Sequence, residues 1–491
     1  MDTRRFGHRR QSQGYLSDEF QLSRLPEKLI LRVFSYLTHK ELCTIARVCK
    51  QWRRIAYDEH LWMALKLRPE YGGLNITNSD QLFALINQRS GSSLRYIELN
   101  SDLITIPVLE ELGNKCTNLK FMTLDFSNAM QLHDFNELMA FPGALYYLCI
   151  CLSDVIFMEG LMRKIYHCLS SLEVLHLIGT FERGTEEEEE IYEVINISKI
   201  KAHTPNLTVV NLYGITFIED SHVELLASNC IHLEYVALNY CLNVKGASFN
   251  LLLSNCTRLT TMLLKHCSLE DEHMMVVPWE NSKISELDIS STELSSECLE
   301  NILTRMPGFT YLAVSHVDFF NNKTLNALID GNKLRDIRAL DLSCTPELTE
   351  EPLHKLVNQH GEKLRGFMLH GKPQLTEYFW TMDLCFGCST WLVLQVQHTC
   401  ACRPDFGEFR QSLPKPGGAG DAVGPRNHSF QREQQKVYRS FTTLTLEDGK
   451  YYEMVKGNFE RAARQGVVRT TTVFNTTIYR LLRRFTDLKF N

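Results

Sequence analysis

A pattern of apolar residues at positions i, i+3 and i+5 recurs through the middle of the chain, and it constrains the fold more than any other feature. The first copy is LRYIEL, with Leu94, Ile97 and Leu99 at the three positions. Successive copies are separated by 25, 26, 27, 35, 26, 26, 25, 25, 28 and 27 residues, a regularity that random apolar placement does not produce. The eleven clear copies begin at Leu94, Leu119, Leu145, Leu172, Leu207, Leu233, Leu259, Ile284, Phe309, Ile337 and Leu364.

This spacing is typical of leucine-rich repeats. Within each copy, the alternation predicts a short strand whose inward side chains stack on the next repeat. Segments just before the next copy, such as 108–116, 222–230 and 248–256, carry apolar residues at helical spacing. A strand plus a helix in each repeat predicts an α/β solenoid, with a parallel ladder of strands on its concave side.

The array is expected to cover residues 94–402 in about 11–12 repeats. Trp391, Leu394 and Val396 repeat the spacing 27 residues beyond Leu364 and predict a degenerate twelfth strand. The single step of 35 residues leaves room for an insertion near residues 182–194, which includes a run of glutamates at 186–190. Like charges in a run cannot be buried together, so this run predicts a solvated loop or a binding site for a basic partner.

The cysteines fit the repeat. Cys116, Cys230 and Cys256 each lie three residues before the first leucine of a repeat, whereas Cys241 and Cys267 lie eight residues after one. These regular positions predict buried structural thiols rather than reactive ones. Because the N-terminus lacks the apolar core of a secretory signal, the sixteen cysteines are expected to be reduced, in the cytoplasm, the nucleus or both.

Composition narrows the function classes. The net charge of −6 argues against a globally basic, nucleic-acid-binding surface. Windows of about 18 consecutive apolar residues do not occur, so no transmembrane helix is expected. The sequence also contains no P-loop, GxSxG or HExxH motif. These absences are consistent with a chain that needs no nucleophile, base, metal or cofactor of its own.

Residues 21–68 predict a compact helical block ahead of the repeats, joined to them by a connector at 69–93. Pro26 lies near the start of its first helix, where the missing N–H costs little. Thr38 and Glu41 have the spacing of a capping box for the second helix. Three short helices cannot enclose a full core, so the large apolar side chains of this block predict a partner that covers them.

This block resembles the F-box family over the whole motif of roughly forty residues. The matching residues are Leu25, Pro26, Leu29, Val33, Phe34, Tyr36, Leu37, Glu41, Leu42, Ala46, Val48, Cys49, Trp52, Ala56, Asp58, Leu61 and Trp62. The resemblance implies docking on a Skp-type adaptor, which bridges to the cullin and RING subunits of an SCF ubiquitin ligase. It implies adaptor contacts for Leu25, Pro26, Leu29, Ile30, Val33, Phe34, Leu37, Leu42, Val48, Cys49 and Trp52. Packing between the helices is the alternative for each, and it is the preferred explanation for Ile45, Ala46 and Leu61.

An F-box followed by leucine-rich repeats is similar to the F-box/leucine-rich-repeat group. That similarity implies a non-catalytic receptor subunit whose repeats bind a protein substrate for ubiquitination and proteasomal degradation. The alternative is an interaction scaffold that does not lead to degradation. Substrate contacts are expected from outward strand positions, namely Glu98, Asp125, His176, Tyr213, Asn239, Lys265, Asp288, Asp341 and His370. Several of these are acidic, which favours a basic or mixed partner segment.

The two ends of the chain are less informative. Residues 1–20 are polar and basic and are expected to be disordered. Residues 403–491 carry 16 Lys/Arg and 9 Asp/Glu and remain unassigned, since they could cap the solenoid, bind an acidic partner or stay mobile. Around the degenerate twelfth strand, a CxxC pair and an HxCxC segment could supply zinc ligands, but their spacing matches no zinc ribbon. We therefore expect no metal at Cys385, Cys388, His398, Cys400 and Cys402.

Overall fold

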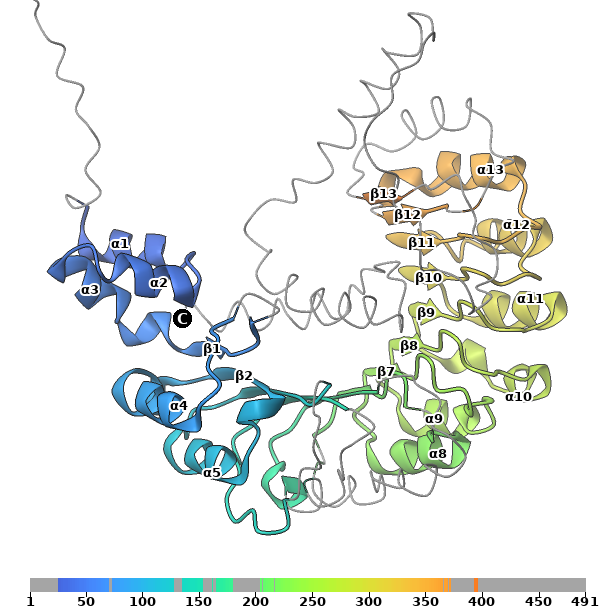
Figure 1. Cartoon of the computed structure of the whole chain (residues 1–491). Helices are drawn as coiled ribbons and strands as arrows, with labels where there is room; N and C mark the ends of the chain where they lie inside the picture. The colour runs from blue at the N-terminus through green and yellow to red at the C-terminus, as the bar shows by residue number, and fades with distance from the viewer. Residues whose placement is uncertain are drawn as a thin grey trace, which may run out of the picture.

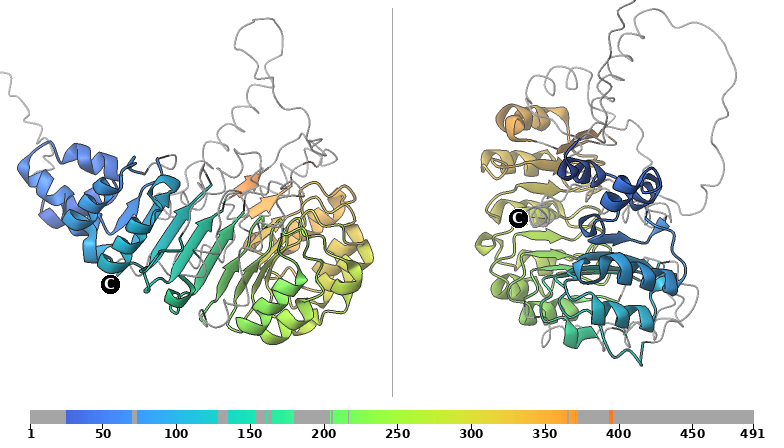
Figure 2. Two further views of the ribbon diagram at one scale, coloured as in Figure 1. Left: turned by 60° about the horizontal axis from the view of Figure 1, so that its bottom comes forward. Right: turned by 90° about the vertical axis from the view of Figure 1, so that its left-hand side faces the viewer.

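A computed structural model describes residues 25–69, 73–127, 135–152, 161, 165–179, 204, 206–215, 217–364, 366–369, 371 and 393–395. In these residues, three short N-terminal helices precede an array of alternating strands and helices that bends into an arc (Figure 1). Strands line the inner, concave side and helices lie on the outer, convex side, as two further views also show (Figure 2). The predicted α/β solenoid is confirmed.

The described strands form one parallel sheet of thirteen strands, each paired with the next along the chain. Eleven of them, β2 to β12, are the strands predicted from the clear repeats, and β13 is the degenerate twelfth. The bounds are β1 Ala64–Lys66, β2 Tyr96–Asn100, β3 Phe121–Asp125, β4 Tyr147–Cys151, β5 Val174–Ile178, β6 Val209–Asn211, β7 Tyr235–Ala237, β8 Thr261–Leu263, β9 Glu286–Asp288, β10 Tyr311–Ala313, β11 Ala339–Asp341, β12 Gly366–Met368 and β13 Val393–Gln395.

Helices return the chain from one strand to the next. The helices α5, α8 and α9 begin and end within two residues of the three segments that the sequence predicts. The bounds are α4 Ser79–Leu85, α5 Ile106–Lys115, α8 Asp220–Asn229, α9 Phe249–Asn255, α10 Asp271–Met275, α11 Ser296–Arg305, α12 Asn322–Asp330 and α13 Glu350–His360. Short 3-10 helices lie at Glu59–Leu61, Gly91–Ser93, Ser101–Leu103, Tyr166–Cys168, Trp279–Asn281 and Gly361–Lys363, and a π-helical turn at Ile86–Ser90. None of the described helices is long and apolar enough to cross a membrane.

The inward repeat positions form the core. In the middle of each strand, Ile97 is in register with Met122, which is in register with Leu148, and all three are fully buried. One continuous cluster of such residues extends from Ile30 in the first helix to Leu369 after β12. The N-terminal helices and the repeats therefore share a core instead of packing as separate bodies.

The strands become shorter along the array, and the shorter strands are each followed by a turn with a positive φ. β2 to β5 have five residues, whereas β6 to β12 have three. In these later repeats, the residue seven positions after the first core residue has a positive φ, as at Tyr240 (63°), His266 (57°) and His316 (57°). This conformation lets the residue's N–H donate to a carbonyl of the next repeat, for example from Tyr240 to Lys265 at 2.8 Å. The strands β6 to β12 each end three residues before this position.

The N-terminal helices are α1 Glu27–Phe34, α2 His39–Ile45 and α3 Lys50–Ala56. Pro26 is the N-cap of α1, and Thr38 and Glu41 form the predicted capping box of α2. The strand β1 was not predicted. It begins two residues after Trp62, inside the segment assigned to the helical block, and pairs with β2.

The cysteines behave as the repeat predicts. Cys116, Cys230, Cys241, Cys256 and Cys267 are buried free thiols. The Sγ atoms of Cys241 and Cys267 donate to carbonyls of the preceding repeat, Leu212 at 3.0 Å and Leu238 at 3.1 Å. Burial raises the pKa of Cys241 to about 12, which keeps the thiol protonated near neutral pH. The predicted insertion at 182–194 and the segments 1–20 and 403–491 lie outside the described residues.

Candidate functional site

The first helix, α1, divides its apolar residues between two faces. Ile30 and Phe34, four residues apart, point into the core and are 0% and 2% exposed. Leu29 and Val33, also four residues apart, lie on the other side and are 48% and 42% exposed. The helix is therefore buried along one stripe and presents a second apolar stripe to its surroundings.

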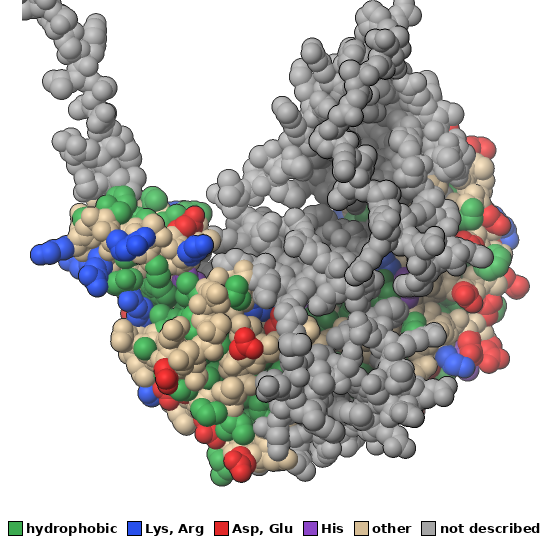
Figure 3. Space-filling model, viewed as in Figure 1, with side chains coloured by type: hydrophobic (Ala, Val, Ile, Leu, Met, Phe, Trp, Pro, Cys, Tyr) green, Lys and Arg blue, Asp and Glu red, His purple; other side chains and the backbone are tan. Residues whose placement is uncertain are grey.

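Two more large apolar side chains of the N-terminal block are exposed outside α1. Tyr36 is 58% exposed after the end of α1, and Val48 is 63% exposed just before α3. Figure 3 shows apolar side chains and lysines or arginines together over the N-terminal helices. We call Leu29, Val33, Tyr36 and Val48 the docking face.

The docking face is held by packing beneath it. The ring of Phe34 meets Trp52 edge to face, with 5.5 Å between centroids. The indole Nε1 of Trp62 donates to the Ala56 carbonyl at 2.8 Å and joins α3 to the start of the sheet. The guanidinium of Arg89 lies 3.4 Å from the centre of the Tyr57 ring, which ties the connector to the same unit.

The structure separates the eleven residues expected to contact an adaptor into two groups. Ile30, Phe34 and Leu42 are buried, which favours the alternative of packing between the helices. The adaptor contacts of all eleven residues stay a prediction. The other eight are exposed or half-buried: Leu25, Pro26, Leu29, Val33, Leu37, Val48, Cys49 and Trp52.

At the N-terminal end of the sheet, just after β1, Arg68 forms a buried ion cluster with two of the expected substrate-binding residues. Its Nε donates to Glu98 at 2.8 Å and its Nη1 donates to Asp125 at 3.1 Å. The Tyr96 hydroxyl also donates to Glu98. The side chains of Arg68, Glu98 and Asp125 are 2%, 1% and 3% exposed. We call these three residues with Tyr96 the Arg68 cluster.

Electrostatics explain why this arginine stays charged. Burial alone would lower the pKa of Arg68, but the Glu98 and Asp125 carboxylates hold the pKa well above its usual value. Glu98 and Asp125 are therefore paired with Arg68 and buried, and their contact with a substrate stays a prediction. The sequence contained the signal for β1, since Trp62, Leu65 and Leu67 have the i, i+3, i+5 spacing.

The other expected substrate-face residues are distributed along the strands. His176 is half-buried, and its Nδ1 lies 3.2 Å from the Asn211 side-chain nitrogen. Burial lowers the pKa of His176 to about 4, so the ring is neutral at physiological pH. Tyr213, Asp288 and Asp341 are buried, whereas Asn239 and Lys265 are half-buried. His370 and the candidate zinc ligands at 385–402 lie outside the described residues.

Sequence reasoning listed the polar outward positions and missed an apolar stretch between them. The apolar outward residues form a second hydrophobic cluster, which is separate from the core and lies on the concave side of the sheet. Its members are Val174, Val209, Tyr235, Ala237, Leu263, Tyr311, Ala313 and Ala339. Because every second residue of a strand faces the same side, the repeat spacing alone could have located them.

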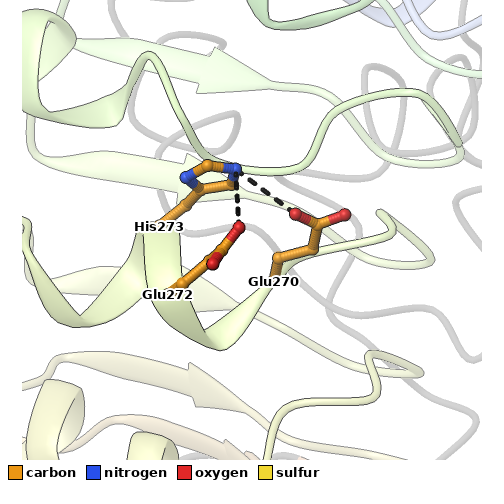
Figure 4. Close-up of side chains that lie close together, drawn as sticks. All are labelled: Glu270, Glu272 and His273. Atoms are coloured by element: carbon orange, nitrogen blue, oxygen red, sulfur yellow. Dashed lines mark ion pairs between the residues drawn. The ribbon is translucent and has the colours of Figure 1, made fainter.

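Among the described residues, one group has the composition of a metal site. Glu270, Glu272 and His273 lie together at the start of α10 (Figure 4). The His273 Nε2 lies 3.3 Å from Glu270, which also pairs with Lys245 at 2.8 Å. These side chains are solvent-accessible and form ion pairs with one another, so we interpret them as a surface ion-pair network.

Comparison with known proteins connects these observations. Residues 22–68 match the F-box-like family model. Human F-box/LRR-repeat protein 12 is 29% identical over 111 residues, which cover 21% of this chain and 32% of that protein. Bovine F-box/LRR-repeat protein 4 is 24% identical over 251 residues, 46% of this chain and 39% of that protein. Residues 22–68 therefore form an F-box-like domain, and the chain is similar to F-box/LRR-repeat proteins. It spans about a third of the length of the curated relatives that it matches.

Solved structures with a similar arrangement are more distant. The chain of the yeast Rad7 and Elc1 complex is 17% identical, with a TM-score of 0.38, and the similarity covers 74% of this chain and 96% of that one. An internalin (inlF) from Listeria monocytogenes is 18% identical, with a TM-score of 0.35, covering 58% and 69%.

Proposed function

We propose that this protein is the substrate-recognition subunit of an SCF ubiquitin ligase. The F-box domain docks a Skp-type adaptor, and the repeats hold the protein that is ubiquitinated and then degraded. The observation that carries the proposal is the docking face, which exposes four large apolar side chains on the very segment that matches the F-box-like model.

Covering the docking face would supply binding energy. Apolar surface contributes roughly 25 cal/mol per Å² when it is removed from water, or about 1.5–3 kcal/mol for a fully buried aliphatic side chain. Leu29 and Val33 are about half exposed, and Val48 is more exposed, so together they can supply several kcal/mol. Because their neighbours Ile30 and Phe34 already anchor α1, a partner would not need to reorganise the helix.

The chemistry is positional in this proposal. A receptor that binds both the ligase and the substrate raises the effective concentration of a substrate lysine near a ubiquitin-loaded enzyme. The receptor itself then needs neither a nucleophile nor a metal.

The role of the docking face in adaptor binding can be tested with two matched double substitutions. Leu29→Asp with Val48→Asp places two charges on it, at side chains that are 48% and 63% exposed. Leu225→Asp with Val276→Asp places the same two charges at side chains elsewhere on the solenoid that are 39% and 72% exposed. We expect the first pair to weaken binding of a purified Skp-type adaptor at least about 100-fold, because each loss costs about 1.5–3 kcal/mol.

The second pair is expected to change that affinity less than about threefold. Titration calorimetry on the full chain measures both. Equal affinity of the two double variants would contradict the docking assignment. Binding of adaptor without recruitment of cullin would instead favour a scaffold that does not direct ubiquitin transfer.

A further inference from the structure

The three N-terminal helices carry an excess of positive charge, although the chain as a whole is acidic. Residues 25–56 contain seven Lys/Arg and two Asp/Glu, whereas the whole chain has a net charge of −6. Of the two acids, Glu27 pairs with Arg54, and Glu41 accepts hydrogen bonds from Thr38 in the capping box of α2. The cations of these helices therefore outnumber the acids that could neutralise them.

Two of these cations form a stripe beside the exposed apolar stripe of α1. Lys28 and Arg32 are four residues apart and exposed, and each comes one residue before a member of the docking face, Leu29 or Val33. Successive residues of an α-helix lie about 100° apart around its axis. The core residues of α1 follow on the other side, so the exposed apolar stripe lies between the core and a row of cations.

A third cation lies beside Val48. An ion pair joins Glu27, the first residue of α1, to Arg54 near the end of α3, and the edge-to-face ring contact joins the end of α1 to the first half of α3. The two helices therefore run antiparallel, and the beginning of α3 lies toward the end of α1. Arg47 and Val48 come just before α3, and both are exposed.

These three cations have no ion-pair partner within the part of the chain that the structure describes. Lys28, Arg32 and Arg47 are exposed, and none of them contacts a described carboxylate or aromatic ring. We call these three residues the cationic rim. Figure 3 shows lysines and arginines among the apolar side chains over the N-terminal helices. Because exposed charges contribute little to folding stability, the fold itself does not require this arrangement.

We propose that the partner covering the docking face presents an acidic protein surface, with Asp or Glu side chains along one side of an apolar groove. This proposal deepens the proposed function and rests on it, because it names the chemistry of the adaptor's binding surface. The groove would cover Leu29, Val33 and Val48, and the acids would face the cationic rim. Charges at the edge of an interface act mainly on the rate of association, since they steer the partner before apolar contact forms.

An anionic membrane is the other surface that binds cations beside apolar side chains. The docking face is spread over α1 and the loop before α3, and short packed helices hold it above a buried core. Membrane-surface segments are instead commonly one continuous amphipathic helix. The docking face and the cationic rim also lie within the segment that matches the F-box-like model. These observations favour a protein partner.

The rate of adaptor binding to the full chain tests the proposal. Lys28→Gln with Arg32→Gln and Arg47→Gln removes the cationic rim, and stopped-flow mixing with a purified Skp-type adaptor measures association and dissociation separately. At low ionic strength, we expect this rim variant to associate at least about tenfold more slowly than the wild type. Its dissociation rate is expected to stay within about twofold of the wild type.

The matched control, Arg258→Gln with Lys283→Gln and Arg335→Gln, removes three exposed cations from the later repeats. Both rates of this control are expected to stay within about twofold of the wild type. At high ionic strength, where charges are screened, the rim variant is expected to associate within about twofold of the wild-type rate, which also shows that it is folded. Equal slowing of the two variants, or slowing of the rim variant that persists at high ionic strength, would overturn the proposal.

Further outcomes separate this proposal from others. Adaptor binding at a rate that neither ionic strength nor the rim variant changes would overturn the acidic surface and leave the proposed function standing. No adaptor binding by the wild type would overturn the proposed function and this proposal with it. Vesicles of phosphatidylcholine and phosphatidylserine in equal amounts are expected to bind the wild type and the rim variant alike. Vesicle binding that the rim variant alone loses would overturn the assignment to a protein partner.

Discussion

Arg68 is buried between two carboxylates, and this environment determines what its replacement would do. With the cation gone, Glu98 and Asp125, which are 1% and 3% exposed beside it, would lose the guanidinium that donates to both. Sequence reasoning placed these two acids on an open surface because it assigned Trp62 and the residues after it to the helical block. A side chain's accessibility depends on neighbours far away in the chain, and 57 residues separate Arg68 from Asp125.

We expect Arg68→Met to lower the free energy of unfolding by about 3–5 kcal/mol, because it breaks a buried ion cluster from one side. Urea denaturation of the full chain measures the change. Arg95→Met, at an exposed arginine just before the neighbouring strand β2, is the control and is expected to change stability by less than about 0.5 kcal/mol. Equal effects of the two substitutions would show that the cluster adds no stability.

His176 gives the fold a pH dependence of known sign. Its pKa is lowered to about 4 by burial, whereas an unfolded histidine titrates near about 6.5. Its contribution to stability is therefore fully present above pH of about 6.5 and is lost as the pH falls toward 4. We expect the wild type to lose about 1–2 kcal/mol more than His176→Gln between pH 7 and pH 5. Parallel stability curves for the two proteins would contradict this.

At the scale of elements, the regular part of the fold follows from local signals. The i, i+3, i+5 alternation predicted β2 to β12, and Trp391, Leu394 and Val396 predicted β13, because each strand carries its own core residues. The positive-φ turns were not predicted, since tyrosine and histidine give no local signal for that conformation. The positive-φ conformation depends on the next repeat, because the N–H group of each such residue donates to a carbonyl of that next repeat.

Replacing a left-handed residue by glycine should therefore relieve strain. Ser291 has a φ of 57°, which an L-residue adopts at a cost of about 1–2 kcal/mol. We expect Ser291→Gly to be neutral or to stabilise the protein by up to about 1 kcal/mol. Ser285→Gly, just before β9, lacks that benefit and is expected to destabilise it by about 0.5–1 kcal/mol. Thermal unfolding of both variants makes the comparison, and the reverse order would argue against strain at the turns.

At the scale of the whole molecule, one hydrophobic core joins the F-box domain to the repeats. β1 extends the solenoid sheet back to within two residues of Trp62, and the Arg68 cluster fixes β1 to β2 and β3. A substrate on the concave side would therefore be held at a constant position relative to an adaptor on the docking face. Such a fixed geometry is what a positional mechanism requires.

Quantitative capture of the full chain from cells, followed by measurement of co-purified adaptor and cullin, tests the central claim most directly. The wild type and the Leu225→Asp, Val276→Asp control are expected to recover both subunits in similar amounts. The Leu29→Asp, Val48→Asp variant is expected to lose both together, at least about tenfold. Recovery of adaptor and cullin by this variant at the wild-type level would contradict the account.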